Sequence, residues 1–176
     1  SGGDVPPPPD ENYSLSFDGE NDWVDTGISY TDLSGSSAIT FSVSFKWRSG
    51  DSDGEYQGII TSFESGNRQI GLSINNQGYL EFGFMSSSFQ EVQFDLETIN
   101  FDEWYNISVV LSDNQLLWYR DGELIETDNV EFQTLGQESD AVPVLSIGRG
   151  NRVYGQFFDG VIDNINLWNI GHSSTE

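Results

Sequence analysis

The sequence contains no cysteine, and this absence excludes both a disulfide framework and a metal site built on thiolates. It also contains no run of about 18 apolar residues, which is the length that a membrane-spanning helix needs. We therefore expect no insertion into a membrane.

Basic residues are scarce. Lysine and arginine together number 6 against 29 aspartates and glutamates, and the formal net charge is -23. Such a chain repels the phosphate backbone of nucleic acids and the surface of an anionic membrane. Charge of one sign also opposes folding unless it is spread over a well-solvated surface or neutralised by bound cations such as calcium. The charge therefore argues against nucleic acid as a partner. It is compatible with either a well-solvated acidic surface or bound cations.

Proline is rare outside one cluster, Pro6–Pro9, which is followed by Asp10 and Glu11. A run of this kind predicts an extended linker with polyproline character, so we assign residues 1–11 to a linker. Residues 12–176 suffice for one sizeable hydrophobic core and are too few for two. We expect a single domain over 12–176, joined to neighbouring domains of the same polypeptide.

Strand patterns dominate the chain. Residues 39–47 alternate between large apolar and polar side chains over nine positions, which indicates a strand with one buried face. Asp121-Gly122 is a strong signal for a tight hairpin turn. Further strand patterns cover residues 58–63, 69–74, 79–84, 105–111, 115–120 and 123–125. Because no long segment has the 3.6-residue period of a helix, we predict an all-β fold, a two-sheet antiparallel β-sandwich whose first and last strands lie side by side.

Three blocks of the sequence resemble a known family. Residues 14–19 and 22–24 resemble its opening strand, and residues 104–109 and 117–122 resemble its central hairpin. Residues 145–149 and 158–165 resemble its closing strand pair. The family is that of the laminin G-like domains in the concanavalin A-like lectin and glucanase superfamily, which also includes pentraxins. The resemblance implies a jelly roll, often a structural calcium, and usually a binding role. Since the superfamily contains both lectins and hydrolases, it does not fix the function.

Asp163 is the strongest candidate for a metal ligand. The alternation of the closing strand places it on one face with apolar residues, and a buried carboxylate must be paired or metal-bound. If the end strands pair antiparallel, Asp18 lies near it, and Asp22 is a further candidate. Two carboxylates with backbone carbonyls form an oxygen site that suits Ca²⁺. The alternative is that Asp163 caps a turn or pairs with an arginine such as Arg149.

One loop near the end of the chain combines hydrogen-bond donors with an aromatic ring, as a sugar-binding site does. Its candidate ligand-binding residues are Arg149, Asn151, Arg152, Tyr154 and Gln156, and we add Tyr56. The alternative is that Arg149 serves packing and the rest is a turn. Of the tryptophans, Trp47, Trp104, Trp118 and Trp168 fall in strand patterns and are predicted to be in the core, whereas Trp23 is predicted to be exposed.

A catalytic alternative rests on residues 126–131, which fit the E-x-D-x-x-E pattern of bacterial β-glucanases in the same superfamily. There Glu126 and Glu131 would be the nucleophile and the acid/base of a retaining glycosidase. Against it, the stretch follows a hairpin turn directly, and the chain offers no second catalytic cluster. We therefore expect a non-catalytic, calcium-stabilised glycan-binding or adhesion module of a larger secreted or cell-surface protein, bacterial in character. A small β-glucanase and a purely structural spacer domain of an adhesin are the alternatives.

Overall fold

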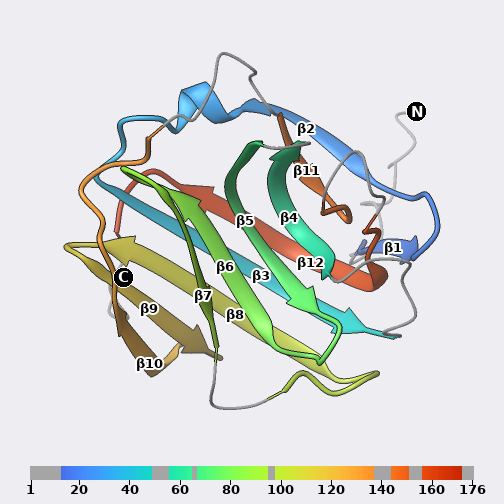
Figure 1. Ribbon diagram of the computed structural model, residues 1–176. Coiled ribbons are helices and arrows are strands. Elements are labelled where there is room, and N and C mark those ends of the chain that lie inside the picture. Colours follow the sequence, from blue (N-terminus) through green and yellow to red (C-terminus); the bar gives the residue numbers. More distant parts are fainter. Residues whose placement is uncertain are drawn as a thin grey trace, which may run out of the picture.

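Two antiparallel sheets pack face to face in the computed structural model (Figure 1). The structure describes residues 13–48, 56–64, 67–94, 98–136, 144–150 and 156–171. Within these residues each sheet has six strands, and all neighbouring strands run antiparallel. The prediction of an all-β, two-sheet antiparallel β-sandwich is confirmed.

The first sheet contains both end strands, β1 and β12. Its order is β1-β12-β3-β8-β9-β10, with β1 Leu15–Asp18, β12 Asp159–Trp168, β3 Ala38–Trp47, β8 Trp104–Ser112, β9 Gln115–Arg120 and β10 Glu123–Asn129.

The second sheet has the order β2-β11-β4-β5-β6-β7, with β2 Val24–Ser29, β11 Val144–Ile147, β4 Tyr56–Glu64, β5 Asn67–Asn75, β6 Leu80–Met85 and β7 Phe89–Gln93. A short 3-10 helix, η1 Tyr30–Asp32, follows β2. A capping box formed by Ser29 and Asp32 fixes its start.

The core lies between the sheets and is rich in aromatic rings. The alternation predicted for residues 39–47 is that of β3, whose large apolar residues are buried while Ser42, Ser44 and Lys46 are half-exposed. Phe41 of the first sheet meets Phe82 of the second edge to face, with ring centroids 5.4 Å apart. Contacts of this kind bury a continuous apolar layer and hold the two sheets together.

The tryptophan prediction is right for two of the four strand residues. Trp47 and Trp118 are buried, with 3% and 1% of their surface exposed. Trp104 and Trp168 are 52% and 37% exposed, so their assignment to the core was wrong. The reason is position in the pleat: Trp104 pairs with Lys46 and Trp168 with Thr40, both on the outer face of β3.

In each sheet, an edge strand from the start of the chain pairs with a strand from its end. β1 pairs with β12, and β2 pairs with β11 (Figure 1). The expectation that the first and last strands lie side by side is therefore confirmed. We call the β1–β12 pairing the strand seam.

A β-bulge in β12 moves Asp163 to the outer face. Asn164 has a positive φ of 49°, and the pairing with β3 shifts between Asp163 and Asn166. Before the bulge the buried Ile162 faces the core, so its neighbour Asp163 faces outward and is half-exposed. After the bulge Ile165 and Leu167 pack against the core. The expectation that Asp163 shares a buried face with these residues was wrong, because the extra residue changes the alternation.

Tyr30 makes folding sensitive to alkaline pH. Its ring is buried, its hydroxyl donates to the Gly136 carbonyl, and burial raises its pKa above the ordinary value of 10. Since the folded pKa lies above the unfolded one, the stabilisation is complete below about pH 10 and is lost as the pH rises further. A spectroscopic pH titration should therefore show one of the seven tyrosines ionising only as the protein unfolds.

The matched variant is Tyr30→Phe. It should lower the free energy of unfolding at neutral pH by about 1 kcal/mol, because the buried hydrogen bond is lost. It should also remove the late-ionising tyrosine from the titration. Ionisation of all seven tyrosines in the folded protein would contradict the prediction.

Candidate functional site

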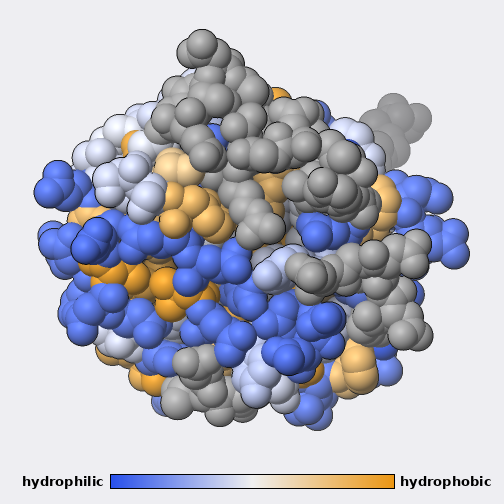
Figure 2. Space-filling model, viewed as in Figure 1, coloured by the Kyte–Doolittle hydropathy of each residue, from blue (hydrophilic) through white to orange (hydrophobic). Residues whose placement is uncertain are grey.

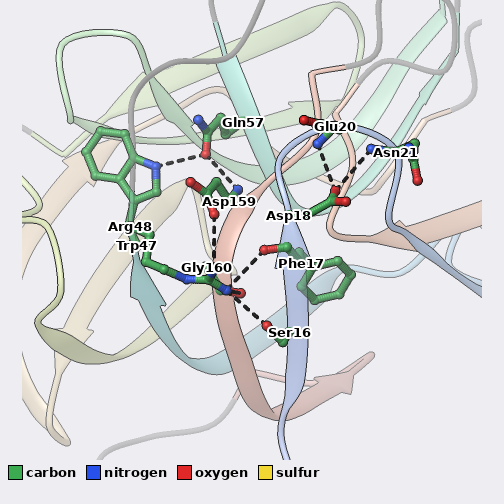
Figure 3. A network of polar contacts seen from close by, with 10 residues as sticks. All are labelled: Ser16, Phe17, Asp18, Glu20, Asn21, Trp47, Arg48, Gln57, Asp159 and Gly160. Carbon is green, nitrogen blue, oxygen red and sulfur yellow. Dashed lines mark hydrogen bonds and ion pairs between the residues drawn. The ribbon is translucent and has the colours of Figure 1, made fainter.

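The Arg48 guanidinium lies over the strand seam. Arg48 directly follows β3, and its backbone N–H donates to the Asp159 carbonyl at 2.9 Å. Its Nη2 donates to Ser16 Oγ at 2.9 Å, to the Phe17 carbonyl at 3.1 Å and to the Gly160 carbonyl at 2.9 Å (Figure 3). Its Nη1 lies 3.6 Å from Asp159 Oδ1. One side chain just beyond the end of β3 therefore reaches over β12 to β1.

Gln57 connects the two sheets beside this network. Its side-chain carbonyl accepts from the Trp47 indole N–H at 2.8 Å and from the Asp159 backbone N–H at 3.1 Å (Figure 3). Gln57 belongs to β4 in the second sheet, whereas the two donors belong to the first. The side chain is buried, so this bridge is shielded from water.

The two carboxylates of the seam have different environments. Asp18 Oδ1 accepts from the backbone N–H groups of Glu20 and Asn21 at 2.9 and 3.2 Å, and these bonds lower its pKa. The pKa of Asp159 is raised, first by burial and then by the nearby charges of Asp18 and Asp102, against the opposing charge of Arg48. The seam thus holds an acidic pair next to a single guanidinium.

The predicted metal ligands are not brought together. Asp18 pairs across the seam with Asp159, not with Asp163. Asp163 is half-exposed, and its Oδ1 accepts from the backbone N–H of Asn164 at 2.8 Å, which matches the alternative of a turn cap. Asp22 is exposed in the turn after Asp18. The described part of the chain holds no cluster of three or more acidic or histidine side chains suited to a metal. Calcium binding stays a prediction.

Part of the predicted recognition loop can be placed. The Arg149 guanidinium stacks on the Trp23 ring with its carbon 3.6 Å from the centroid, and Arg149 Nη2 donates to Ser146 Oγ at 3.1 Å. Arg149 is buried, with 7% exposed, whereas Trp23 is 40% exposed, as predicted for it. The pairing of Ile147 with Val24 in the β11–β2 ladder brings these two side chains together. Arg149 is thus a packing residue that supports an exposed indole.

The remaining residues of the predicted loop divide into two groups. Gln156 is half-buried, and its carbonyl accepts from the backbone N–H groups of Gly58 and Gly150. Tyr56, at the start of β4, is half-buried two residues before Gly58, on the strand that Gln156 contacts. The other candidates, Asn151, Arg152 and Tyr154, lie outside the described residues. The structure therefore brings together Gln156 and the start of β4.

Buried polar side chains on the outer face of the second sheet were not foreseen. Ile70, Leu72 and Ile74 of β5 face the core, so the residues between them face outward, yet these are also buried. The buried outward-facing residues of β5 with side chains are Gln69, Ser73 and Asn75. Asn75 Nδ2 donates to Glu81 Oε1 at 2.6 Å. Within the described residues neither amide atom of Gln69 has a hydrogen-bond partner, which is unusual for a buried polar group.

Figure 2 shows the molecule from the side of the second sheet. Among the residues coloured there, hydrophilic ones predominate, and apolar residues form smaller areas between them. Gln69, Ser73 and Asn75 are each less than a tenth exposed, so they form a buried polar layer on the sheet and not an open ligand-binding surface. Sequence reasoning missed it because Gln69, Ser73 and Asn75 look like ordinary solvent-facing residues of an alternating strand.

A pocket of about 600 Å³ lies at the opposite end of the strands from the seam. Its lining residues are Ser86, Ser87, Asn114 and residues 130–134. Glu131 lies here, beyond the end of β10, where its backbone is held by the Gln90 amide. Glu126 lies within β10, an edge strand, opposite Trp118. The two glutamates of the catalytic alternative therefore belong to different elements.

The family model of the concanavalin A-like lectin/glucanases superfamily matches residues 18–176. The chain belongs to this superfamily. The resemblance noted for the three sequence blocks is thus confirmed over nearly the whole chain. A comparison with curated protein sequences gives no match.

Solved structures with the same fold include carbohydrate-binding domains. The CBM40 domain of the Ruminococcus gnavus IT-sialidase aligns with a TM-score of 0.68 at 16% identity, over 93% of this chain and 92% of that one. The same domain has been solved with α2,3-sialyllactose bound. A heptameric SAP-like pentraxin from Limulus polyphemus aligns with a TM-score of 0.62 at 17% identity, over 92% of this chain and 77% of that one. At these identities the similarity shows the fold.

Proposed function

We propose that this chain is a non-catalytic glycan-binding module of a larger secreted or cell-surface protein, such as an adhesin or a polysaccharide-degrading enzyme. Support comes from the superfamily, from the sialyllactose-bound domain that shares the fold, and from the separation of Glu126 and Glu131 on different elements. Within the described residues no helix is long and apolar enough to cross a membrane. Calcium stabilisation, expected from the sequence at Asp18, Asp22 and Asp163, is proposed for a site other than this trio, which the structure does not bring together.

The observation that carries the proposal is the Trp23 platform, the exposed indole supported by Arg149. The buried guanidinium covers one face of the ring, which fixes its orientation while 40% of the residue stays exposed. A rigid indole loses little entropy on contact with a ligand, and aromatic faces pack well against sugar rings. The proposed ligand therefore stacks on Trp23 and reaches toward the start of β4 and Gln156.

Trp23→Ala tests this site. Removing an aromatic anchor typically costs about 2 kcal/mol of binding free energy, which is roughly a 30-fold loss of affinity. Binding is measured on a glycan array that includes sialylated and neutral polysaccharides, followed by titration calorimetry on the best ligand. Trp168→Ala is the matched control, because Trp168 is similarly exposed but lies at the far end of β12.

Two outcomes contradict the proposal. If Trp23→Ala and Trp168→Ala bind as the unmodified protein does, the site lies elsewhere. If the unmodified protein binds no glycan on the array, the spacer alternative replaces the binding module.

A further inference from the structure

The oxygens of the strand seam converge on one cation, which the chain itself supplies. The Phe17 carbonyl and the Ser16 hydroxyl come from β1, the Gly160 carbonyl and the Asp159 carboxylate from β12, and all four face the guanidinium of Arg48 (Figure 3). β1 and β3 are not neighbours in the sheet, because β12 lies between them. Arg48 therefore connects β1 to β3 across a third strand.

The charges around the seam explain why a cation is needed there. Asp18 and Asp159 are paired directly across β1 and β12, in a chain whose net charge is -23. Two carboxylates at facing positions repel each other and weaken the pairing of the strands that carry them. Asp18 is compensated by the N–H groups of its own turn, whereas Asp159 depends on Arg48.

The superfamily often carries a structural calcium, yet the seam as it stands does not suit one. Ca²⁺ requires six to eight oxygen ligands. Here the carbonyl and hydroxyl oxygens already accept from Arg48 Nη2, and Asp18 Oδ1 already accepts from two backbone N–H groups. A divalent ion would also be repelled by the guanidinium charge next to it.

We propose that Arg48 is the resident cation of the strand seam, taking the place of a metal ion, and that the same oxygens bind a divalent cation only when the guanidinium is removed. Arg48 and calcium at the seam are mutually exclusive. The pairing of the end strands in the unmodified protein is then independent of metal. Glycan binding plays no part in this inference.

The test compares melting temperatures of the unmodified protein, Arg48→Ala, Arg48→Lys and Arg120→Ala, each with chelator and with millimolar Ca²⁺. Arg120 is the control, because it is similarly exposed and pairs with Asp121 at 3.8 Å away from the seam. In chelator, Arg48→Ala should melt about 3–6 °C lower than the unmodified protein. Calcium at ten times its dissociation constant should recover about 3–5 °C in Arg48→Ala beyond any shift of the unmodified protein.

Any rise in the melting temperature of the unmodified protein on addition of Ca²⁺ reports calcium bound elsewhere. This rise is subtracted from the rise measured for each variant. Arg48→Lys keeps the charge but lacks the fork of donors, so it should melt between the two and gain less from calcium. Arg120→Ala should respond to calcium as the unmodified protein does.

Three results would overturn the proposal. One is an equal calcium response in Arg48→Ala and in the unmodified protein. Another is a melting temperature of Arg48→Ala, in chelator, equal to that of the unmodified protein. The third is an Arg48→Ala protein that stays unfolded at every calcium concentration, whereas folding only in the presence of calcium supports it.

Discussion

Replacing Gly148 by alanine should destabilise the domain by about 4 kcal/mol and lower its melting temperature by roughly 10 °C. Gly148 has a φ of 79°, and a Cβ built there would lie 2.2 Å from Cε1 of Phe17. The Phe17 ring cannot move aside, because it is buried and packs edge to face on Phe158 with centroids 6.3 Å apart. The left-handed backbone costs a further 1–2 kcal/mol, about as much as the overpacking.

Gly122→Ala is the matched control. Gly122 has a φ of 82°, almost the same backbone conformation, but nothing lies within 4 Å of the added Cβ. This variant should lose only about 1 kcal/mol. Urea unfolding of both variants measures the difference, and similar losses in the two would show that the contact with Phe17 contributes nothing.

Gln57→Leu should cost about 3 kcal/mol of unfolding free energy. The change removes the acceptor for the Trp47 indole N–H and for the Asp159 backbone N–H, and leucine offers neither donor a replacement. Leaving a buried donor unsatisfied costs about 1–3 kcal/mol for each group. Urea unfolding followed by tryptophan fluorescence, to which the buried Trp47 beside this bridge contributes, measures the loss.

Gln90→Leu separates this effect from the loss of any glutamine. The Gln90 amide also makes two hydrogen bonds, with the backbone N–H and carbonyl of Glu131, but at an exposed position. Water can replace these bonds, so we expect a loss below about 1 kcal/mol. If Gln57→Leu is as mild as Gln90→Leu, the link between the sheets at Gln57 is not important for stability.

The strands and their pairing were predictable because they depend on a short period. The alternation in β3 assigns every side chain to a face without reference to the rest of the molecule. The pairing of β1 with β12 followed from matching end blocks and from the need to cover sheet edges.

The site was less predictable because it depends on register and on single-residue irregularities. Asp159 lies opposite Asp18, four residues before the predicted partner Asp163. An alternating pattern shows which face a residue is on, but not which residue of the neighbouring strand it pairs with. The bulge at Asn164 reversed the expected orientation of Asp163. Asparagine tolerates a positive φ, but an asparagine in a strand pattern does not by itself predict a bulge. The role of Arg48 could have been predicted from the sequence. This residue continues the outward series of Ser44 and Lys46, and it is one of only six basic residues.

The pairing of early with late strands also constrains how the domain folds. β1 and β2 obtain their partners only from β12 and β11, which lie more than a hundred residues further along the chain. Topologies dominated by such distant contacts fold slowly, because the entropy of closing the long loop is lost before the contacts form. During synthesis on the ribosome, the hairpins β4–β5, β5–β6 and β8–β9 can therefore form early, whereas β1 and β2 stay unpaired until residues after 144 emerge. Until then, the sparing use of apolar residues in β2 and the acidic character of the chain protect these two strands from aggregation.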